Sequence, residues 1–210
     1  VRIRPLLSKD LAEGATESVR RVAGEPQVVL GLDRAFTYDH VFEPAASQAA
    51  VYTESARPLI DGVLGGFNAT VLAYGQTGSG KTHTMTGSGV GDMRGIVPRA
   101  VEQILSKVHD LEAAGWEYQV AASFMEIYNE VLYDLLDPSG KSGTAKRKAD
   151  SNIDIKEHPV LGVYVQGLQE IAVDSHAKIQ ALMDQGQEMR AVASTNMNAT
   201  SSRSHSIFII

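Results

Sequence analysis

The chain has 210 residues, of which 43% are hydrophobic and 21% are charged, and its formal net charge is −6. This length can bury one sizeable core, as one large domain or part of one. The negative charge argues against a chain built to coat nucleic acid, and the absence of cysteine excludes disulfides and thiolate metal sites. No apolar run approaches the roughly 18 to 20 residues that span a bilayer, so we expect no membrane partner.

The two ends of the chain look cut. The first residues, VRIRPLLSKD, lack an initiator methionine and the apolar stretch of a signal peptide. The last residues, SHSIFII, stop within an apolar, β-branched run that is followed by neither a turn nor polar residues. We therefore expect part of a longer protein, and its composition is consistent with the cytosol.

Strands and helices are expected to alternate along the chain. Runs rich in Val, Ile, Tyr and Phe predict strands at 1–6, 27–32, 35–42, 69–74, 118–128, 162–173 and 204–210. Helical spacing of apolar residues predicts helices at 47–66, 97–114 and 175–194. The segment EHPVLGVYVQG (157–167) suggests an added antiparallel hairpin. The alternation indicates a layered α/β domain.

Local signals refine two of these helices. Ser47 is expected to cap the helix 47–66, which closes on Gly65 and Gly66, with a kink at Pro58. Ser175 is expected to cap the helix 175–194, with Gly186 as its weak point. The apolar residues expected to face inward from this last helix are Ile179, Leu182 and Met183.

The segment that follows the strand 69–74 carries the sharpest signal. Residues 75–82, GQTGSGKT, match the phosphate-binding pattern GxxxxGK[ST]. Glycines let successive backbone amides turn inward as an anion nest, and a helix that begins at Lys81 adds unpaired N–H groups. Lys81 would reach the β- and γ-phosphates, and the hydroxyl of Thr82 would bind Mg²⁺. The residues expected to hold the phosphates are Gly75, Gln76, Thr77, Gly78, Ser79, Gly80, Lys81 and Thr82.

A glycine-rich turn between a strand and a helix is the plain structural alternative, but every fixed position of the pattern is present. We therefore expect a nucleoside triphosphate to bind here. Kinases, GTPases, helicases and motors share such a loop, so the loop alone does not identify the function. The sequence contains no NKxD guanine-reading motif, which favours ATP.

Further stretches narrow the function. The chain opens with RIRP (2–5), places AY before and HTM after the phosphate loop, and closes with NATSSRSH (198–205). Together with SFMEIYNEVLYDLL (123–136), they resemble a kinesin motor domain over essentially the whole chain. The stretch GFNATVLAYGQTGSGKT (66–82) resembles the chromokinesin-type branch most. The resemblance implies a P-loop NTPase fold of the α/β class, with a central mixed β-sheet flanked by helices on both faces and truncated at the C-terminal side.

By this resemblance, Arg2 and Pro5 flank the adenine of ATP, with His83 on its other side. The residue types agree, because guanidinium and imidazole groups stack on a base and a proline ring packs against one. Without the resemblance, Arg2 and Arg4 would be interpreted as solvated strand-edge charges, and His83 as an ordinary residue of a first helical turn.

Residues 198–205 would be switch I, the loop that senses the γ-phosphate. Ser202 would meet Mg²⁺ or the γ-phosphate, while Asn198 and Ser201 would help to place the attacking water and the phosphate. Hydroxyl and amide groups suit this role because they bind phosphate oxygens without adding charge. A loop whose hydroxyls form local turns is the structural alternative, but it leaves Arg203 unexplained. In the family this arginine pairs with a glutamate in switch II, a DxxGxE stretch that is absent from the sequence.

Two segments are candidates for contact with tubulin. IDIKEHPVLGVYVQG (153–167) matches a family hairpin at the tubulin face, with Lys156 and His158 as its polar contacts. The loop 137–152 holds almost no apolar side chain, and its basic part, Lys141 to Lys148, could meet the acidic tails of tubulin. A flexible, solubilising surface loop explains the same composition.

Residues 1–210 are thus interpreted as a partial motor domain, the nucleotide-binding portion of an ATP-hydrolysing microtubule motor that uses ATP and Mg²⁺. We expect the full domain to be an ATPase and the isolated chain to be inactive without switch II. The alternatives are a catalytically incomplete module that binds nucleotide or tubulin, and an unrelated P-loop ATPase. We further expect microtubules of the cytoplasm as its location, with the nucleus or spindle as other candidates, and no direct nucleic-acid partner. The parent protein would be a homodimer through a coiled coil outside these residues.

Overall fold

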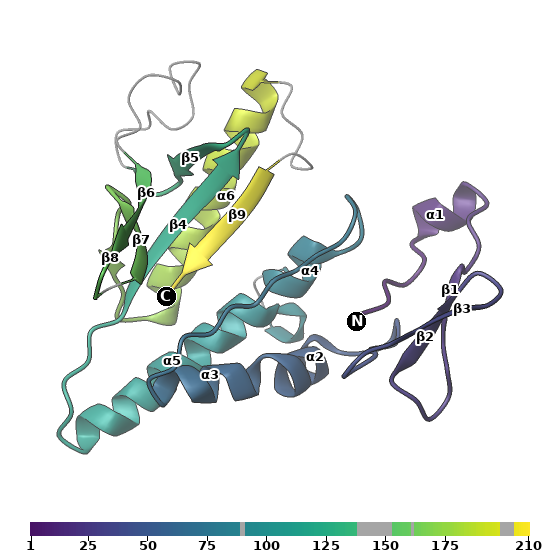
Figure 1. Ribbon diagram of the computed structural model, residues 1–210, viewed down its shortest axis with the longest axis horizontal. Coiled ribbons are helices and arrows are strands. Elements are labelled where there is room, and N and C mark those ends of the chain that lie inside the picture. Colours follow the sequence, from purple (N-terminus) through teal and green to yellow (C-terminus); the bar gives the residue numbers. More distant parts are fainter. Residues whose placement is uncertain (89–90, 138–152, 161, 198–203) are drawn as a thin grey trace. The chain divides into compact units, whose positions relative to one another are not determined.

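The structure is a computed structural model that describes residues 1–88, 91–137, 153–160, 162–197 and 204–210. It divides into two compact units, Val1–Ile104 and Leu105–Ile210, each of which holds both helices and strands (Figure 1). No helix in the described ranges combines the length and the apolar character that crossing a bilayer requires.

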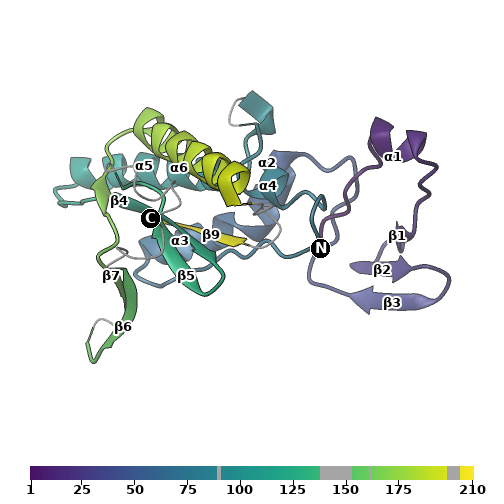
Figure 2. The same cartoon turned by 90° about the horizontal axis from the view of Figure 1, so that it is seen from above.

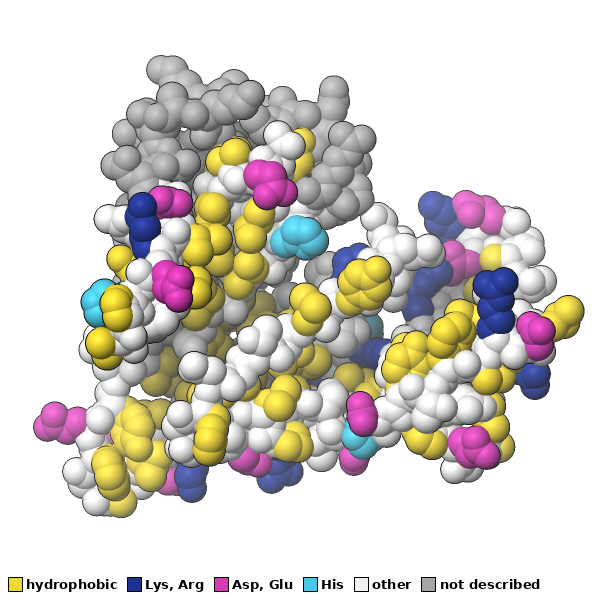
Figure 3. Space-filling view, viewed as in Figure 1, with side chains coloured by type: hydrophobic (Ala, Val, Ile, Leu, Met, Phe, Trp, Pro, Cys, Tyr) yellow, Lys and Arg dark blue, Asp and Glu magenta, His cyan; other side chains and the backbone are white. Residues whose placement is uncertain are grey.

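The first unit begins with an extended segment and a small sheet. Arg2 makes an isolated parallel bridge to Phe42, so the strand predicted at 1–6 is reduced to this one bridge. The short helix α1 is followed by a three-stranded antiparallel sheet, in which β2 lies between β1 and β3. Figure 3 shows hydrophobic side chains gathered over these strands, and Leu30, Phe36 and Tyr38 are among the exposed ones. The elements are α1 (Ser8–Ala12), β1 (Val19–Arg21), β2 (Gln27–Leu30) and β3 (Arg34–Thr37).

The helix predicted at 47–66 consists of two helices, α2 (Gln48–Ser55) and α3 (Arg57–Leu64). Ser47 caps α2 as predicted, because its Oγ accepts a hydrogen bond of 3.1 Å from the backbone N–H of Ala50. Pro58 lies in the first turn of α3, where its missing N–H costs no helical hydrogen bond. The expected kink is therefore a break between two helices, and α3 ends at Gly65 as predicted.

The strand predicted at 69–74 is wrong, because residues 67–75 form neither helix nor strand. Leu72 is 82% exposed and Tyr74 is 96% exposed. A strand requires a neighbour for its backbone hydrogen bonds, and none of the strands in the described ranges pairs with this segment. The helices that follow are close to prediction: α4 (Lys81–Met85) begins at Lys81, and after the short η1 (Gly91–Met93) comes α5 (Ile96–Ala113).

The second unit is built around β4, which uses both of its edges. It pairs with β9 along six residues, with β5 along four of the same residues on the opposite edge, and with β8 at its first two residues, always in antiparallel register. Asn129 and Glu130 form the two-residue turn between β4 and β5, and both have positive φ, at 51° and 62°. The elements are β4 (Ala121–Tyr128), β5 (Val131–Asp134), β8 (Ile171–Ala172) and β9 (Ser204–Ile209).

Helix α6 (His176–Met197) lies along this sheet and contacts β4 (Figures 1 and 2). The three apolar residues predicted to face inward are buried, at 2% to 7% exposure. Gly186 was expected to weaken the helix, but it is a packing position: a Cβ there would lie 2.2 Å from Cδ1 of Phe124. Phe124 in turn meets Phe208 edge-on, with ring centroids 5.3 Å apart. Only glycine allows α6 to approach β4 this closely.

The predicted hairpin is present as β6 (Asp154–His158) paired with β7 (Gly162–Gln166). All five residues of β6 are exposed, and the hairpin projects from the rest of its unit in Figure 2. The basic loop predicted at 137–152 lies, apart from its first residue, outside the described ranges.

Candidate nucleotide-binding site

The loop 75–82 has the backbone that a phosphate cradle requires. Gly80, the residue before α4, has φ 97°, and Gly78 has φ 81°. Both values lie in the left-handed region, which glycine adopts without strain. At Gly75 a Cβ would lie 2.6 Å from Oγ of Ser79, so a larger residue would distort the loop. Each glycine of the motif thus has a physical reason to be glycine.

Lys81 crosses the loop. Its Nζ donates hydrogen bonds to the carbonyl oxygens of Gly75 and Gln76, at 2.7 and 2.8 Å. These carbonyls carry only partial negative charge, so a phosphate oxygen can compete with them for the ammonium group. Thr82 follows on α4 and is exposed, as are Gln76 and Thr77. The residues predicted from the motif therefore lie together on one loop and one helical turn, and they fit a nucleotide phosphate.

The far end of α4 is fixed by backbone contacts. The N–H of Gly95 donates to the carbonyl of Thr86 at 2.9 Å, and Gly87 and Arg94 form an antiparallel bridge. A Cβ on Gly95 would lie 2.6 Å from the carbonyl oxygen of Met85. Because α4 has only five residues, this backbone support stabilises it where its own length does not.

On the side predicted to bind the base, the structure brings Arg2 and His83 together. Nη2 of Arg2 lies 3.5 Å from Nε2 of His83, and it donates a hydrogen bond there in the tautomer whose Nε2 carries no proton, because a guanidinium has no acceptor. Burial, and then the charge of Arg2, lowers the pKa of His83, and burial lowers the pKa of Arg2. A neutral imidazole beside a planar cation suits stacking on a base. Pro5, the third residue predicted here, is exposed.

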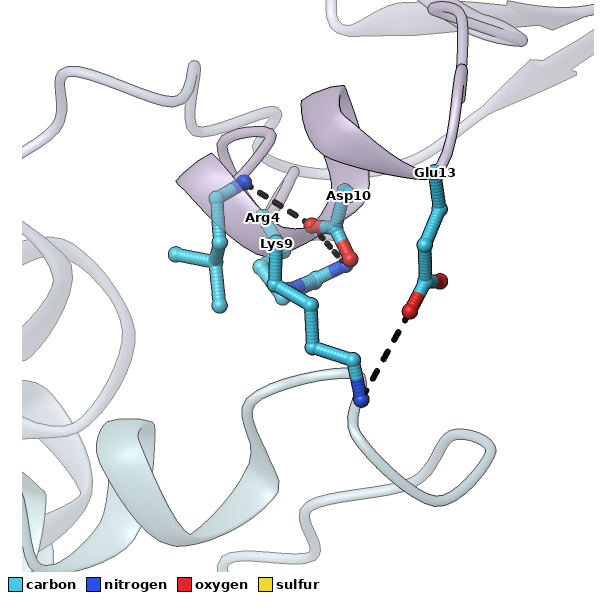
Figure 4. Close-up of polar contacts among 5 residues, drawn as sticks. Arg4, Lys9, Asp10 and Glu13 are labelled. Atoms are coloured by element: carbon cyan, nitrogen blue, oxygen red, sulfur yellow. Dashed lines mark hydrogen bonds and ion pairs between the residues drawn. The ribbon is translucent and has the colours of Figure 1, made fainter.

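Arg4 is not a free edge charge. Its Nη2 lies 2.7 Å from Oδ2 of Asp10, which also accepts the backbone N–H of Leu7 at 2.8 Å (Figure 4). The N–H of Leu7 and then the charge of Arg4 lower the pKa of Asp10. The side-chain stem of Arg4 passes 4.0 Å from the position that a Cβ on Gly80 would take. Arg4 therefore borders the phosphate loop, a place that the sequence did not indicate.

Gln48 is a second residue that sequence reasoning missed. It is 4% exposed and its side-chain amide joins Arg2, the carbonyl of His83 and the carbonyl of Met93. These partners are 46, 35 and 45 residues away along the chain. A single glutamine at the start of a helix carries no motif, so no local signal could have identified it.

In the second unit, the residues predicted as catalytic, Asn198, Ser201, Ser202 and Arg203, lie outside the described ranges. The end of the predicted switch I is described: Ser204 and His205 are the first residues of β9.

The start of β9 is held by a partly buried ion pair. Nε of Arg190 lies 3.0 Å from Oε1 of Glu126, and Nη2 of Arg190 donates to Oγ of Ser204 at 3.3 Å. Glu126 is 5% exposed. The pair therefore connects α6, β4 and the first residue of β9, and sequence reasoning did not find it.

The two residues proposed to meet tubulin lie on β6. Lys156 and His158 alternate along the strand, so they share one face of the hairpin with Asp154. Nζ of Lys156 pairs with Oδ2 of Asp154 at 2.7 Å, and its hydrogen bond lowers the pKa of Asp154. Nδ1 of His158 accepts the backbone N–H of Val160 at 3.2 Å.

Comparisons with known proteins agree with this geometry. The family model described as "Kinesin motor domain" matches residues 2–210. Similar curated proteins include chromosome-associated kinesin KIF4 of Gallus gallus, 43% identical over all of this chain and 17% of its own length. Kinesin-like protein KIF21B of Homo sapiens is 43% identical, with 13% of its length covered. Kinesin-like protein KIN-4A of Arabidopsis thaliana is 42% identical, with 21% covered.

A solved structure has the same fold. It is titled "Structure of a fast kinesin: Implications for ATPase mechanism and interactions with microtubules", and it is 40% identical with a TM-score of 0.86. The match covers 99% of this chain and 56% of that chain, so this chain spans about half of the solved structure and about a fifth or less of these curated relatives. The predicted P-loop NTPase fold and the similarity to chromokinesins are confirmed. Kinesin motor domains are nucleotide-binding ATPases that interact with microtubules, and the chain belongs to the kinesin motor-domain family.

Proposed function

We propose that this chain is the nucleotide-binding portion of an ATP-hydrolysing microtubule motor, which couples ATP turnover to microtubule binding and movement. The observation that carries the proposal is Lys81, whose Nζ lies across the loop 75–82 on two carbonyl oxygens that phosphate can replace. Left-handed glycines before α4 support it, because such backbone angles are typical of a loop whose amides form an anion nest.

The roles of the phosphate-side residues follow from their chemistry. Lys81 exchanges its carbonyl partners for phosphate oxygens and neutralises their charge. The hydroxyls of Thr82 and Ser202 hold Mg²⁺, which when bound offsets negative charge that develops on the phosphates. Asn198 and Ser201 orient the attacking water, and Arg203 connects switch I to the acidic residue of switch II. These last roles are assigned from the family motif.

Arg2, Pro5 and His83 bind the adenine. The 3.5 Å separation of Nη2 of Arg2 and Nε2 of His83 supports this assignment, because it brings together two groups that can stack on a base. The exposed hairpin β6–β7 binds tubulin with Lys156 and His158. Similarity to chromosome-associated kinesins supports microtubules as the location, in the cytoplasm or in the nucleus or spindle. The parent protein is proposed to be a homodimer through a coiled coil outside these residues.

The test is Lys81→Ala in the full-length protein, with Lys107→Ala, an exposed lysine on α5, as the matched control. ATP binding and microtubule-stimulated ATPase activity are measured for both. Lys81→Ala should lower both by about 100-fold or more, because a charge–phosphate contact in the transition state is lost. Wild-type ATP affinity in Lys81→Ala overturns the assignment of the phosphate loop.

A further inference from the structure

Gln48 is a buried amide with a full set of polar partners. It is the first residue of α2, directly after the capping residue Ser47, and only 4% of it is exposed. A buried primary amide costs free energy unless its donors and its acceptor are satisfied. The partners of Gln48 therefore show what it holds in place.

The amide nitrogen holds the end of α4. Nε2 donates to the carbonyl of His83 at 2.7 Å and to the carbonyl of Met93 at 3.2 Å. In a longer helix the N–H of Gly87 would serve the carbonyl of His83, but here it donates to the carbonyl of Thr82 at 3.1 Å. Gln48 supplies the donor that the short helix lacks, and so fixes the backbone at His83.

The amide oxygen holds Arg2. Oε1 accepts from Nη1 of Arg2 at 2.7 Å, and the same Nη1 donates to Oγ1 of Thr84 at 3.1 Å. Nη2 reaches the carbonyl of Ala46 at 3.5 Å. Three acceptors around one planar guanidinium determine the orientation of its plane.

We propose that Gln48 is a positioning residue for the base-binding side of the nucleotide site. One amide fixes both the backbone of His83 and the guanidinium of Arg2, so the two groups keep one mutual geometry before a purine base arrives. Holding them in advance lowers the ordering cost of binding. Gln48 acts on affinity for the base of a purine nucleoside triphosphate and leaves the phosphate contacts and the hydrolysis step unchanged. This inference rests on the proposed function, in which Arg2 and His83 bind the adenine.

The test uses Gln48→Met in the full-length protein, because methionine has a similar volume without the polar groups. The KM for ATP and kcat are measured in microtubule-stimulated ATPase assays, with inorganic tripolyphosphate as a competitive inhibitor that has no base. Gln48→Met should raise the KM for ATP about five- to tenfold, as expected for the net contribution of one hydrogen bond. The inhibition constant of tripolyphosphate and kcat should each stay within about twofold of wild type, because contacts with the base are equal in ground and transition states.

Two further variants separate positioning from general stability. Gln103→Met is the matched control, because Gln103 also joins two side chains, Tyr52 and Asp61, neither of them predicted to bind nucleotide. It should leave the KM for ATP at the wild-type value. Gln48→Glu keeps an acceptor for Arg2 and loses both donors, so it should retain more ATP affinity than Gln48→Met. It replaces Gln48→Met in the test if the methionine variant does not fold.

The decisive comparison is a double-mutant cycle with Arg2→Ala. Because Gln48 acts in part through Arg2, adding Gln48→Met to Arg2→Ala should raise the KM for ATP by a smaller factor than Gln48→Met does in the wild-type background. Full additivity, or equal weakening of ATP and tripolyphosphate, overturns the positioning role. If Arg2→Ala by itself leaves the KM for ATP unchanged, the proposed base pocket is wrong, and that result is distinct from a failure at Gln48.

Discussion

Replacing Gly186 with alanine should destabilise the second unit, although alanine is the better helix former. The added Cβ would lie 2.2 Å from Cδ1 and 2.4 Å from Cε1 of Phe124, whereas carbon atoms in contact need about 3.5 Å. The ring has little freedom to withdraw, because Phe124 is 7% exposed and meets Phe208 edge-on. Overpacking of this kind costs about 1–3 kcal/mol, and the gain in helix propensity returns about 1 kcal/mol.

The expected net loss is thus up to about 2 kcal/mol, or a fall in Tm of up to about 8 °C for a chain of this size. Thermal and urea unfolding followed by circular dichroism measure it in the purified chain. Gly62→Ala on α3 is the control, because a Cβ there has nothing within 4 Å, and it should leave stability equal or raise it. Phe124→Leu should relieve part of the loss in Gly186→Ala. The packing argument fails if Gly186→Ala is as stable as Gly62→Ala.

Three other outcomes can be measured. Thr82→Ala should weaken ATP binding with Mg²⁺ present and much less with the metal chelated, and equal losses by calorimetry in both conditions would remove Thr82 as a ligand. Asp134→Asn should cost about 1–3 kcal/mol in urea unfolding, because both carboxylate oxygens accept backbone N–H groups at 2.8 Å and asparagine keeps one acceptor. Burial raises the pKa of Tyr52 to about 12, so its contribution to stability should fall as the pH rises from 10.0 towards that value. Tyr52→Phe should remove a phenol with a pKa of about 12 from an ultraviolet titration, and a titration unchanged by the substitution contradicts the shift.

Sequence patterns predicted the features that depend on neighbours in the chain. The cap at Ser47, the start of α4 at Lys81 and the buried face of α6 follow from local spacing and side-chain chemistry, and each is confirmed. The glycines of the phosphate loop were predicted for the same reason, because their backbone angles are local.

The features that sequence patterns missed depend on distant parts of the chain. Residues 69–74 have the composition of a strand, but composition does not supply a pairing partner, and the described strands do not provide one. Gly186 was interpreted from helix propensity alone, whereas Phe124, against which it packs, is 62 residues away along the chain. Gln48 and the pair Arg190–Glu126 are defined by long-range partners, which periodicity does not reveal.

The double-edged pairing of β4 has a consequence for hydrogen exchange. Its amides between Ser123 and Tyr128 lie between β9 on one edge and β5 along part of the other. Exchange with solvent requires local opening, and an interior strand opens only when a neighbouring strand also separates. The β6–β7 hairpin has one ladder and exposed residues on both strands, so its amides open independently. Deuterium should therefore enter this hairpin long before β4, and the slow amides of β4 should report the opening of its whole sheet.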